Sequence, residues 1–230
     1  LSMWLADQAT VLKDPSMRRA AAPAVALALE KRGAGLNRLA RFYLRDRDNS
    51  VRRAVLEAVA KRLPKRPAFL FRHVEPLTRS NDPLLRAAAT ALLVPTAAKK
   101  NVQEAQKALV RLLADDEAPV RRAAVKACAK LSKASLGAQQ KGLARGLAQA
   151  VSRGRGSDAR SALESAATLG LASPLARAAS HPEASIRAAA VERLSDSGDK
   201  KTTLAVLEAA RRDSETTLRL AALRAIAAQS

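Results

Sequence analysis

The sequence predicts an all-α protein, a right-handed α-solenoid of about seven stacked helical hairpins. Three observations support this fold class. The chain is 48% hydrophobic but only 2% aromatic, and the alanine and leucine that dominate its apolar residues favour helix over strand. One short motif recurs along the chain. Within its copies, the apolar residues follow the 3.6-residue period of an α-helix.

The recurring motif is an acidic or turn residue, two or three further residues, an aliphatic residue, an arginine and an alanine-rich run. It reads DNSVRRAVLEAVAKRL from Asp48 and EAPVRRAAVKACAKL from Glu117. Other copies begin at Asp14, Asp82, Glu183 and Glu215, and a degraded copy begins at Gly156. We call the arginine of each copy the motif arginine: Arg18, Arg52, Arg86, Arg121, Arg160, Arg187 and Arg219. Their spacing of 27 to 39 residues predicts one structural unit per copy.

Each copy has the features of a helix that begins at the motif. In the second copy, one helix face carries Val51, Ala54, Val55, Ala58 and Val59. The acidic residues Asp14, Asp48 and Asp82 lie where an N-cap belongs, because their oxygens can accept from backbone amides left free at a helix start. Pro15 and Pro83 follow directly, at the first helical position, where proline is tolerated.

A second amphipathic helix is predicted before each motif. The predicted ranges are 2–12, 36–44, 69–78, 104–114, 136–151, 173–180 and 200–211. Such a helix pair cannot bury its apolar stripe alone, so the pairs are expected to stack as one domain over residues 1–230. Two departures are expected to distort the pattern: Pro23 inside the first motif helix, and the 39-then-27 spacing around residues 152–158.

The sequence resembles HEAT repeats, in particular the short bacterial kind called PBS-lyase-like. The resemblance rests on the Asp-x-x-Val-Arg core at Asp48–Arg52 and its counterparts in the other copies. It implies that the motif opens the second helix of each pair, and that these helices line a concave face. It also implies that the motif arginine pairs with an acidic group of a neighbouring unit. We therefore interpret these arginines as structural. The motif arginines left out of the candidate site on this ground are Arg18, Arg52, Arg86, Arg121, Arg187 and Arg219.

Charge is distributed unevenly along the chain. The whole chain has 41 basic and 21 acidic residues, a net charge of +20. Residues 1–160 hold 32 of the basic and 13 of the acidic residues, whereas residues 161–230 hold 9 and 8. The basic part, 1–160, is thus predicted to meet an anion, and the near-neutral part, 161–230, to serve a separate contact.

Candidate anion-binding residues are basic residues outside the repeat skeleton. Arg122, Lys126 and Lys130 lie four residues apart on one predicted helix face, where like charges repel unless an anion meets them. Two loops add basic residues, the proline-containing segment 61–72 and the glycine-containing segment 152–158. An ordinary solvated face and a plain flexible connector are the alternatives. The predicted polyanion-binding set is Arg19, Arg53, Lys61, Arg62, Lys65, Arg66, Arg122, Lys126, Lys130, Arg153 and Arg155.

Three functions are compatible with this sequence. The first is a non-enzymatic module that binds nucleic-acid backbone, most simply DNA, along a basic concave surface. The second is a protein-interaction scaffold for an acidic partner segment. The third is an enzyme similar to the HEAT-like alkylpurine DNA glycosylases, which rely on tryptophans and an aspartate, whereas this chain has one tryptophan, Trp4.

Signals for catalysis, cofactors and metals are poor. The chain has no phosphate loop, HExxH or GxSxG motif, and its histidines, His73 and His181, are more than 100 residues apart. The single cysteine, Cys128, falls on an apolar helix face, as a buried small residue would. We expect no enzyme activity, no cofactor, no small-molecule substrate and no membrane segment, and a cytoplasmic location. Because the sequence starts at Leu1, a trimmed chain or a piece of a larger protein is also expected.

Overall fold

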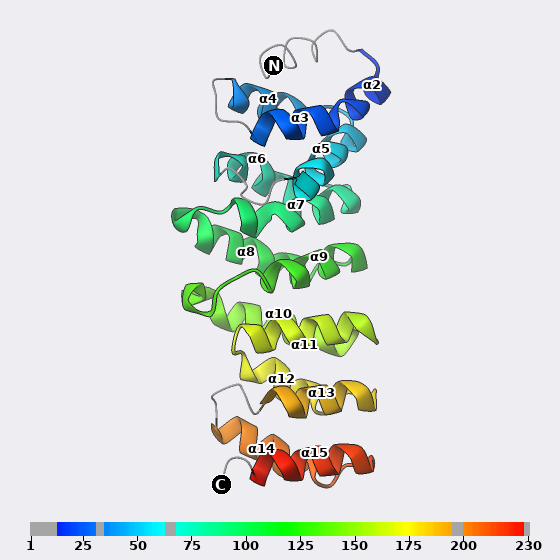
Figure 1. Ribbon diagram of the computed structural model, residues 1–230, viewed down its shortest axis with the longest axis vertical. Helices are drawn as coiled ribbons and strands as arrows, with labels where there is room; N and C mark the ends of the chain where they lie inside the picture. The colour runs from blue at the N-terminus through cyan, green and yellow to red at the C-terminus, as the bar shows by residue number, and fades with distance from the viewer. Residues whose placement is uncertain (1–12, 31–34, 63–67, 195–199, 228–230) are drawn as a thin grey trace. The chain divides into compact units, whose positions relative to one another are not determined.

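The computed structural model describes residues 13–30, 35–62, 68–194 and 200–227, and every element within these ranges is helical (Figure 1). The described residues group into two compact units. The first comprises residues 1–108 and 116–127, and the second comprises residues 109–115 and 128–230. The all-α, helical-repeat fold class predicted from the sequence is confirmed.

The helices alternate along the chain between two kinds. The motif helices are α2 (Pro15–Ala20) with α3 (Ala22–Glu30), α5 (Asn49–Arg62), α7 (Pro83–Thr96), α9 (Ala118–Cys128), α11 (Ser157–Thr168), α13 (Ala184–Leu194) and α15 (Thr216–Ala227). The preceding helices, here called first helices, are α4 (Leu36–Leu44), α6 (Phe71–Val74) with the 3-10 helices η1 (Ala68–Leu70) and η2 (Glu75–Arg79), α8 (Val102–Leu113), α10 (Gln140–Arg153), α12 (Ala172–Ala178) and α14 (Lys200–Ala210). The first predicted helix, 2–12, lies outside the described residues.

Within each unit, helices of the same kind pack on one another. In the first unit, α3 packs on α5 and α5 on α7, while α4 packs on α6. In the second unit, α10 packs on α12 and α12 on α14, while α11 packs on α13 and α13 on α15. Each unit therefore has a layer of first helices and a layer of motif helices, as stacked hairpins require.

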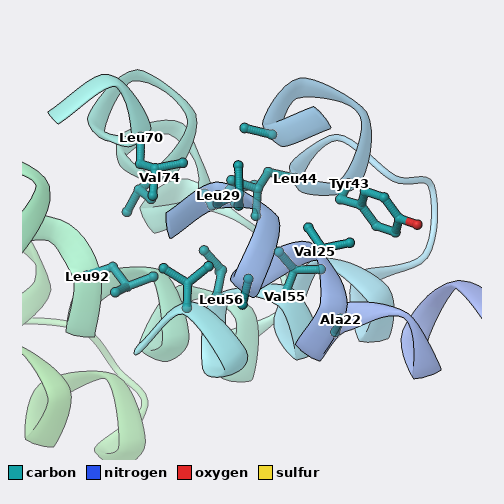
Figure 2. Close-up of a cluster of buried hydrophobic side chains, with 14 of the residues drawn as sticks. Ala22, Val25, Leu29, Tyr43, Leu44, Val55, Leu56, Leu70, Val74 and Leu92 are labelled. Carbon is teal, nitrogen blue, oxygen red and sulfur yellow. The ribbon is translucent and has the colours of Figure 1, made fainter. Parts of the chain in front are cut away.

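The core of the first unit lies between these two layers (Figure 2). Val25 and Leu29 of α3 meet Val55 and Leu56 of α5, and Tyr43 of α4 closes the cluster, all with at most 1% of their surface exposed. The stripe predicted for α5 is largely confirmed: Val51, Val55 and Val59 are buried, whereas the alanines at 54 and 58 are partly exposed and pack at the edge of the cluster.

The acidic residues of the motif are N-caps, as predicted. The Asp14 carboxylate accepts the Ser16 N–H at 2.8 Å, and the Asp48 carboxylate accepts the Ser50 N–H at 2.7 Å. The Asp82 carboxylate accepts from Leu84 and Leu85 at 2.9 and 3.2 Å. These bonds satisfy backbone donors that a helix start leaves without partners.

Both sequence irregularities have structural outcomes. Pro23 divides the first motif helix into α2 and α3 at Ala21, because proline has no N–H to donate to the preceding turn. The long spacing after Arg121 is taken up by two 3-10 turns, Lys133–Ser135 and Gly137–Gln139, before α10 begins. The first helix predicted at 69–78 is also broken, into η1, α6 and η2, with Pro76 at the start of η2.

The motif arginine closes the turn that precedes its own helix. Nη1 of Arg187 donates to the carbonyls of His181 and Pro182, both at 3.0 Å. Arg219 donates in the same way to Asp213 and Ser214, at 2.8 Å each. The corresponding bonds, to carbonyls five or six residues before the arginine, are also formed by Arg18, Arg86 and Arg121.

At Arg18 and Arg187, the motif arginine also reaches the next repeat. Arg18 donates from Nε and Nη2 to the Asp46 carboxylate at 2.7 and 3.1 Å. Arg187 binds Asp213 through the same two nitrogens at 2.9 Å each. Such a bidentate pair fixes both distance and orientation between consecutive repeats. The expectation that motif arginines pair with an acidic group of a neighbouring unit is confirmed at these two positions.

The aspartate of this pair lies at the same place in each of the two repeats, two residues before the acidic residue that begins the motif. Asp46 and Asp213 each also accept the backbone N–H of that motif residue, Asp48 and Glu215, at 2.9 Å. The serine at the same position in the third repeat, Ser80, accepts the Asp82 N–H at 3.2 Å. A serine carries no negative charge and so cannot form an ion pair with the arginine of the preceding repeat, which is Arg52. Nε of Arg52 is buried without a hydrogen-bond partner. We call this position the coupling position.

Replacing Asp213 with asparagine should produce a pH-dependent loss of stability. Hydrogen bonds from Arg187 and from the Glu215 N–H hold the pKa of Asp213 below its ordinary value. A carboxyl with a lowered folded pKa stabilises the native state above its unfolded pKa, about 3.9, and this stabilisation is lost as pH falls through the folded pKa. Asp213→Asn should therefore lower the Tm at pH 7, and the difference from the wild type should shrink as the pH falls through the folded pKa of Asp213. The control is Glu192→Gln, at an exposed carboxylate on α13, which should change the Tm little at neutral or acidic pH. A Tm difference for Asp213→Asn that does not change with pH would contradict the ion-pair interpretation.

Replacing Ser80 with aspartate should stabilise the first unit. An aspartate at the coupling position can accept from Arg52 Nε and still cap the Asp82 N–H, as Asp46 does for Arg18 and Asp48. We expect a gain of about 1–2 kcal/mol in the free energy of unfolding, measured by chemical denaturation. Ser80→Asn has a similar shape without the charge and should gain less. An aspartate variant no more stable than the asparagine variant would show that Arg52 does not use this position.

Candidate binding groove

A groove of about 1130 Å³ runs along α10 and α12 in the second unit. One wall is the face of α10 from Gln140 to Arg153, and the other is the start of α12 with the preceding turn, from Gly170 to Arg177. The lengths of the two helices differ: α10 has 14 residues and α12 has 7. The two helices are neighbours in the layer of first helices, and α12 covers only part of the length of α10. The groove therefore follows α10.

Four exposed cations line this groove: Lys141, Arg145 and Arg153 from α10, and Arg177 from α12. No aspartate or glutamate is among its lining residues. Within the described ranges, none of the four forms an ion pair. The groove thus concentrates positive charge that the protein itself does not neutralise, which is the electrostatic character of an anion-binding site.

Apart from Leu171, the neutral residues of the groove are small or carry both donors and acceptors. Ala144 and Ala148 of α10 face it, together with Gly170 and Ala172 of the opposite wall. Gln140, Gln149, Ser152 and Ser173 add amide and hydroxyl groups, each of which can donate and accept hydrogen bonds. Aromatic side chains are not part of the lining. The groove therefore combines small side chains with hydrogen-bonding groups and is open to close approach by a backbone.

Close packing of α10 on α8 places the groove-lining face. Gly142 and Gly146 lie one turn apart on α10 and leave no room for a side chain. A Cβ on Gly146 would lie 2.8 Å from Cδ1 and 2.9 Å from Cβ of Leu113, and a Cβ on Gly142 would lie 3.0 Å from Val110. Because the glycines seat one side of α10 against α8, the side that carries Lys141 and Arg145 is turned to the groove.

The glycine turn after α10 is held by the next repeat. The Gly154 carbonyl lies 3.3 Å from His181 Nε2, and the Gly156 N–H donates to the Glu183 carboxylate at 3.1 Å. His181 is buried, sits at the coupling position of its repeat, and accepts the Glu183 N–H through Nδ1. These hydrogen bonds connect the backbone of Gly154 and Gly156 to the repeat that follows. The side chains of Arg153 and Arg155 remain exposed.

The polyanion-binding set predicted from the sequence is divided between the two units. In the first unit, Arg19, Lys61, Arg62, Arg122 and Lys126 are exposed. Arg53 is partly buried and pairs with Glu57 at 3.7 Å, so part of its charge is neutralised. Lys65 and Arg66 lie outside the described residues. In the second unit, Arg153 lines the groove and Arg155 is exposed in the turn beside it.

One part of the predicted helix face is wrong. Arg122 and Lys126 lie one turn apart on α9, as expected, but α9 ends at Cys128. Lys130 therefore lies in the turn that follows and does not extend the column. The Leu131 N–H donates to the Cys128 carbonyl at 2.9 Å in that turn, where the chain leaves the helix towards the two 3-10 turns.

Sequence reasoning missed three of the four groove cations. Lys141 and Arg145 have the same four-residue spacing that drew attention to Arg122 and Lys126, so this signal was present but was not used. Arg177 carried no such signal, because it lies in the part with almost no net charge. Its role follows only from the packing of α12 on α10.

Other features of the described residues are less suited to an anion or to chemistry. A second groove, of about 650 Å³, lies in the first unit beside Phe69 and Phe71, and its cations, Arg72 and Lys100, are balanced by Glu75 and Glu104. Burial raises the pKa of the Cys128 thiol to about 12, so this thiol is unreactive near neutral pH. Burial, and then the positive charges of nearby arginines, lower the pKa of His73.

The described residues hold neither a metal-binding cluster nor a membrane-spanning helix. No cluster of three or more histidine, cysteine, aspartate or glutamate side chains has a metal-binding arrangement there. None of the helices described is both long and apolar enough to cross a bilayer.

Comparisons with known proteins show the fold. No family model matches the sequence, and no curated protein matches it. Among solved structures, a designed armadillo repeat protein in complex with the peptide (KR)4 is 14% identical, with a TM-score of 0.59, over 83% of this chain and 98% of its own. A HEAT-like repeats protein of the archaeon Thermococcus onnurineus NA1 is 15% identical, with a TM-score of 0.56, over 92% of this chain and 95% of its own.

A chain from the structure of Kap95p with RanGDP is 16% identical, with a TM-score of 0.67, over 98% of this chain but 34% of its own. These likenesses agree with the stacked helix pairs described above. They confirm the fold of armadillo and HEAT-like repeat proteins.

Substituting alanine for Gly146 should destabilise the second unit. Alanine is favoured over glycine inside a helix by about 1 kcal/mol, but its Cβ would overlap Leu113 near the backbone. We expect a net loss of about 1–3 kcal/mol in the free energy of unfolding, measured by chemical denaturation. Gly142→Ala, where the contact is with the Val110 side-chain tip, should lose less. A stabilised Gly146→Ala variant would mean that α10 and α8 are not in close contact there.

Proposed function

We propose that this protein is a non-enzymatic helical-repeat scaffold that binds an acidic segment of a partner protein in the groove between α10 and α12. One observation carries the proposal: Lys141, Arg145, Arg153 and Arg177 line a single groove that contains no carboxylate. The fold supports a binding role, because stacked repeats present long surfaces built from successive units.

The charge arrangement favours an anionic ligand on energetic grounds. Lys141 and Arg145 are one helical turn apart, and like charges at this spacing weakly destabilise a helix. A partner carboxylate would relieve this repulsion. Arginine is suited to the contact, because its planar guanidinium can bind a carboxylate through two parallel hydrogen bonds. Three of the four groove cations are arginines.

The groove suits a polypeptide better than a nucleic acid. Its volume of about 1130 Å³ is just above the range of small-molecule pockets, roughly 300–1,000 Å³, and fits a short segment. Gln140 and Gln149 can both donate and accept, as a peptide bond requires, whereas a phosphate backbone offers acceptors to the protein. Single-stranded nucleic acids are usually held on aromatic side chains, which this groove lacks. A peptide ligand is also compatible with the fold, since the designed armadillo repeat protein noted above is in complex with the peptide (KR)4.

Backbone binding to duplex DNA is the second candidate, favoured by a different observation. Residues 1–160 carry a net charge of +19, out of +20 for the whole chain. Lys61 and Arg62 are exposed on α5, and Lys126 is exposed on α9. Contacts to a duplex backbone need exposed cations alone. This candidate places the binding surface on motif helices of the first unit rather than in the groove.

The glycosylase alternative receives no support from the groove. The chemistry that the resemblance implied needs tryptophan and aspartate side chains in a basic cleft, and the lining residues include neither. Trp4 lies outside the described residues. A scaffold role is therefore the proposal.

Charge reversal in the groove should separate the two candidates. The variant Lys141→Glu/Arg145→Glu and the comparison variant Lys61→Glu/Arg62→Glu change the net charge equally, but at different surfaces. We expect the groove variant to lose about tenfold in affinity for a fluorescent glutamate-rich peptide, about 1.4 kcal/mol, and the comparison variant to lose far less. The measurement is fluorescence anisotropy at ~50 mM salt, where electrostatic binding is strong.

The same two variants are titrated with a labelled duplex DNA. If the duplex binds tightly and only the comparison variant weakens it, while the peptide does not bind, the scaffold proposal is wrong and the DNA candidate is supported. Equal weakening of peptide binding by both variants would also contradict the groove as the site, because it would reflect net charge alone.

A further inference from the structure

Resting on the proposed function, we infer that the acidic segment binds as an extended strand along α10, with acidic side chains at alternate positions, and not as a helix. The observation behind this inference is a column of side chains on α10. Lys141, Arg145, Gln149 and Arg153 follow one another at intervals of four residues, and all four line the groove.

The spacing of this column matches an extended chain. Four residues of an α-helix rise about 6 Å, at 1.5 Å per residue. Two residues of an extended strand span about 6.7 Å, and alternate side chains point to the same side. Each step of the α10 column therefore corresponds to every second residue of an extended ligand. Over the three steps from Lys141 to Arg153, the two spacings differ by roughly 2 Å, which flexible lysine and arginine side chains can absorb.

The chemistry of the column defines a pattern in the ligand. Positions 1, 3 and 7 of the segment would face Lys141, Arg145 and Arg153 and should be acidic. Position 5 would face Gln149, which favours a polar, uncharged side chain or the ligand backbone. Arg177 lies on the other wall. Even-numbered side chains of an extended chain point the opposite way. Arg177 would therefore bind a fourth acidic residue of the ligand, at an even-numbered position.

The remaining groove residues favour a strand over a helix. A second column beside the first, Ala144, Ala148 and Ser152, carries small side chains, so a ligand backbone can come close to α10. An extended backbone has free N–H and C=O groups. The Gln149 amide can bind both kinds, and the Ser152 hydroxyl, which donates to the Ala148 carbonyl at 3.0 Å, can accept from an N–H. A helical ligand has already used these groups within itself, and it needs a channel for a cylinder about 10–12 Å across. Only a strand uses both the cations and the amides.

The test compares three fluorescent peptides with three glutamates each. The alternating peptide is Glu-Ser-Glu-Ser-Gln-Ser-Glu, and the clustered peptide, Glu-Glu-Glu-Ser-Ser-Gln-Ser, has the same composition. The third is an alanine-rich helical peptide with glutamates at positions 1, 5 and 13, which repeats the rise of the α10 cations in helical form. Affinities for the full chain are measured by anisotropy at fixed salt. We expect the alternating peptide to bind about tenfold more tightly than the other two, a difference of about 1.4 kcal/mol.

A double-mutant cycle then tests the register. In the Arg153→Ala variant, replacing the last glutamate of the alternating peptide with serine should cost no further affinity, whereas in the wild type it should weaken binding several-fold. Gln149→Ala should weaken the alternating peptide and leave the clustered peptide unchanged. Gln140→Ala, also in the groove but outside the column, is the matched comparison.

The outcomes distinguish this inference from the proposed function. If the helical peptide binds best, or if all three bind equally and lose affinity in Lys141→Glu/Arg145→Glu, the groove is an acidic-segment site but the extended register is wrong. If none of the peptides binds, or if the groove variant binds them as well as the wild type, the proposed function fails as well.

Discussion

The arginine repeated in each motif is the constraint on which the stacking of this protein depends. Nη1 closes the turn before its own helix at Arg18, Arg86, Arg121, Arg187 and Arg219. At Arg18 and Arg187, Nε and Nη2 also bind the aspartate of the next repeat. One side chain thereby links the turn of one hairpin to the turn of the next. Because the guanidinium is planar and the pair is bidentate, the link specifies orientation as well as distance. Helices of each kind then pack in layers, and the alanine-rich faces can approach closely.

Repeated positions and irregular positions have different roles in the molecule. The motif arginines, the N-cap acids and the coupling positions recur, and their contacts are internal. The candidate groove lies where the pattern is least regular: after two extra 3-10 turns, along α10, and beside an α12 of half its length. The histidine that replaces aspartate at the coupling position, His181, belongs to the same region and anchors the glycine turn after α10. Departures from the repeat thus created a surface that the repeat alone does not offer.

Much of the fold could be predicted from the sequence because it is local and periodic. The N-cap acids, the start of each motif helix and the buried valines of α5 follow from spacing and side-chain chemistry. The break at Pro23 was also visible, although the division into α2 and α3 was not. The end of α9 at Cys128 was missed, since Ala129 and Lys130 continue the helical pattern in the sequence. The coupling position was harder to predict: its residues vary among aspartate, serine and histidine, and its function depends on contact with another repeat.

The candidate site was predictable only in part, for a physical reason. Arg153 was identified from its loop, and Lys141 and Arg145 could have been identified from their spacing. Which cations share a groove depends on how α12 packs on α10, and this brings in Arg177 from a part of the chain with almost no net charge. The net charge of residues 1–160 contributes to the electrostatic potential around the protein, but it does not identify which basic residues line one groove. Packing decides which charges lie together without a carboxylate.

The most direct measurement of this account is hydrogen–deuterium exchange of the full chain with and without a saturating acidic peptide. Ligand contacts slow amide exchange where they suppress local opening. The account predicts slower exchange in α10 and at the start of α12, with no change in α5 or α9. Slower exchange in α5 and α9, with α10 unchanged, would contradict it and place the anion on the motif helices instead.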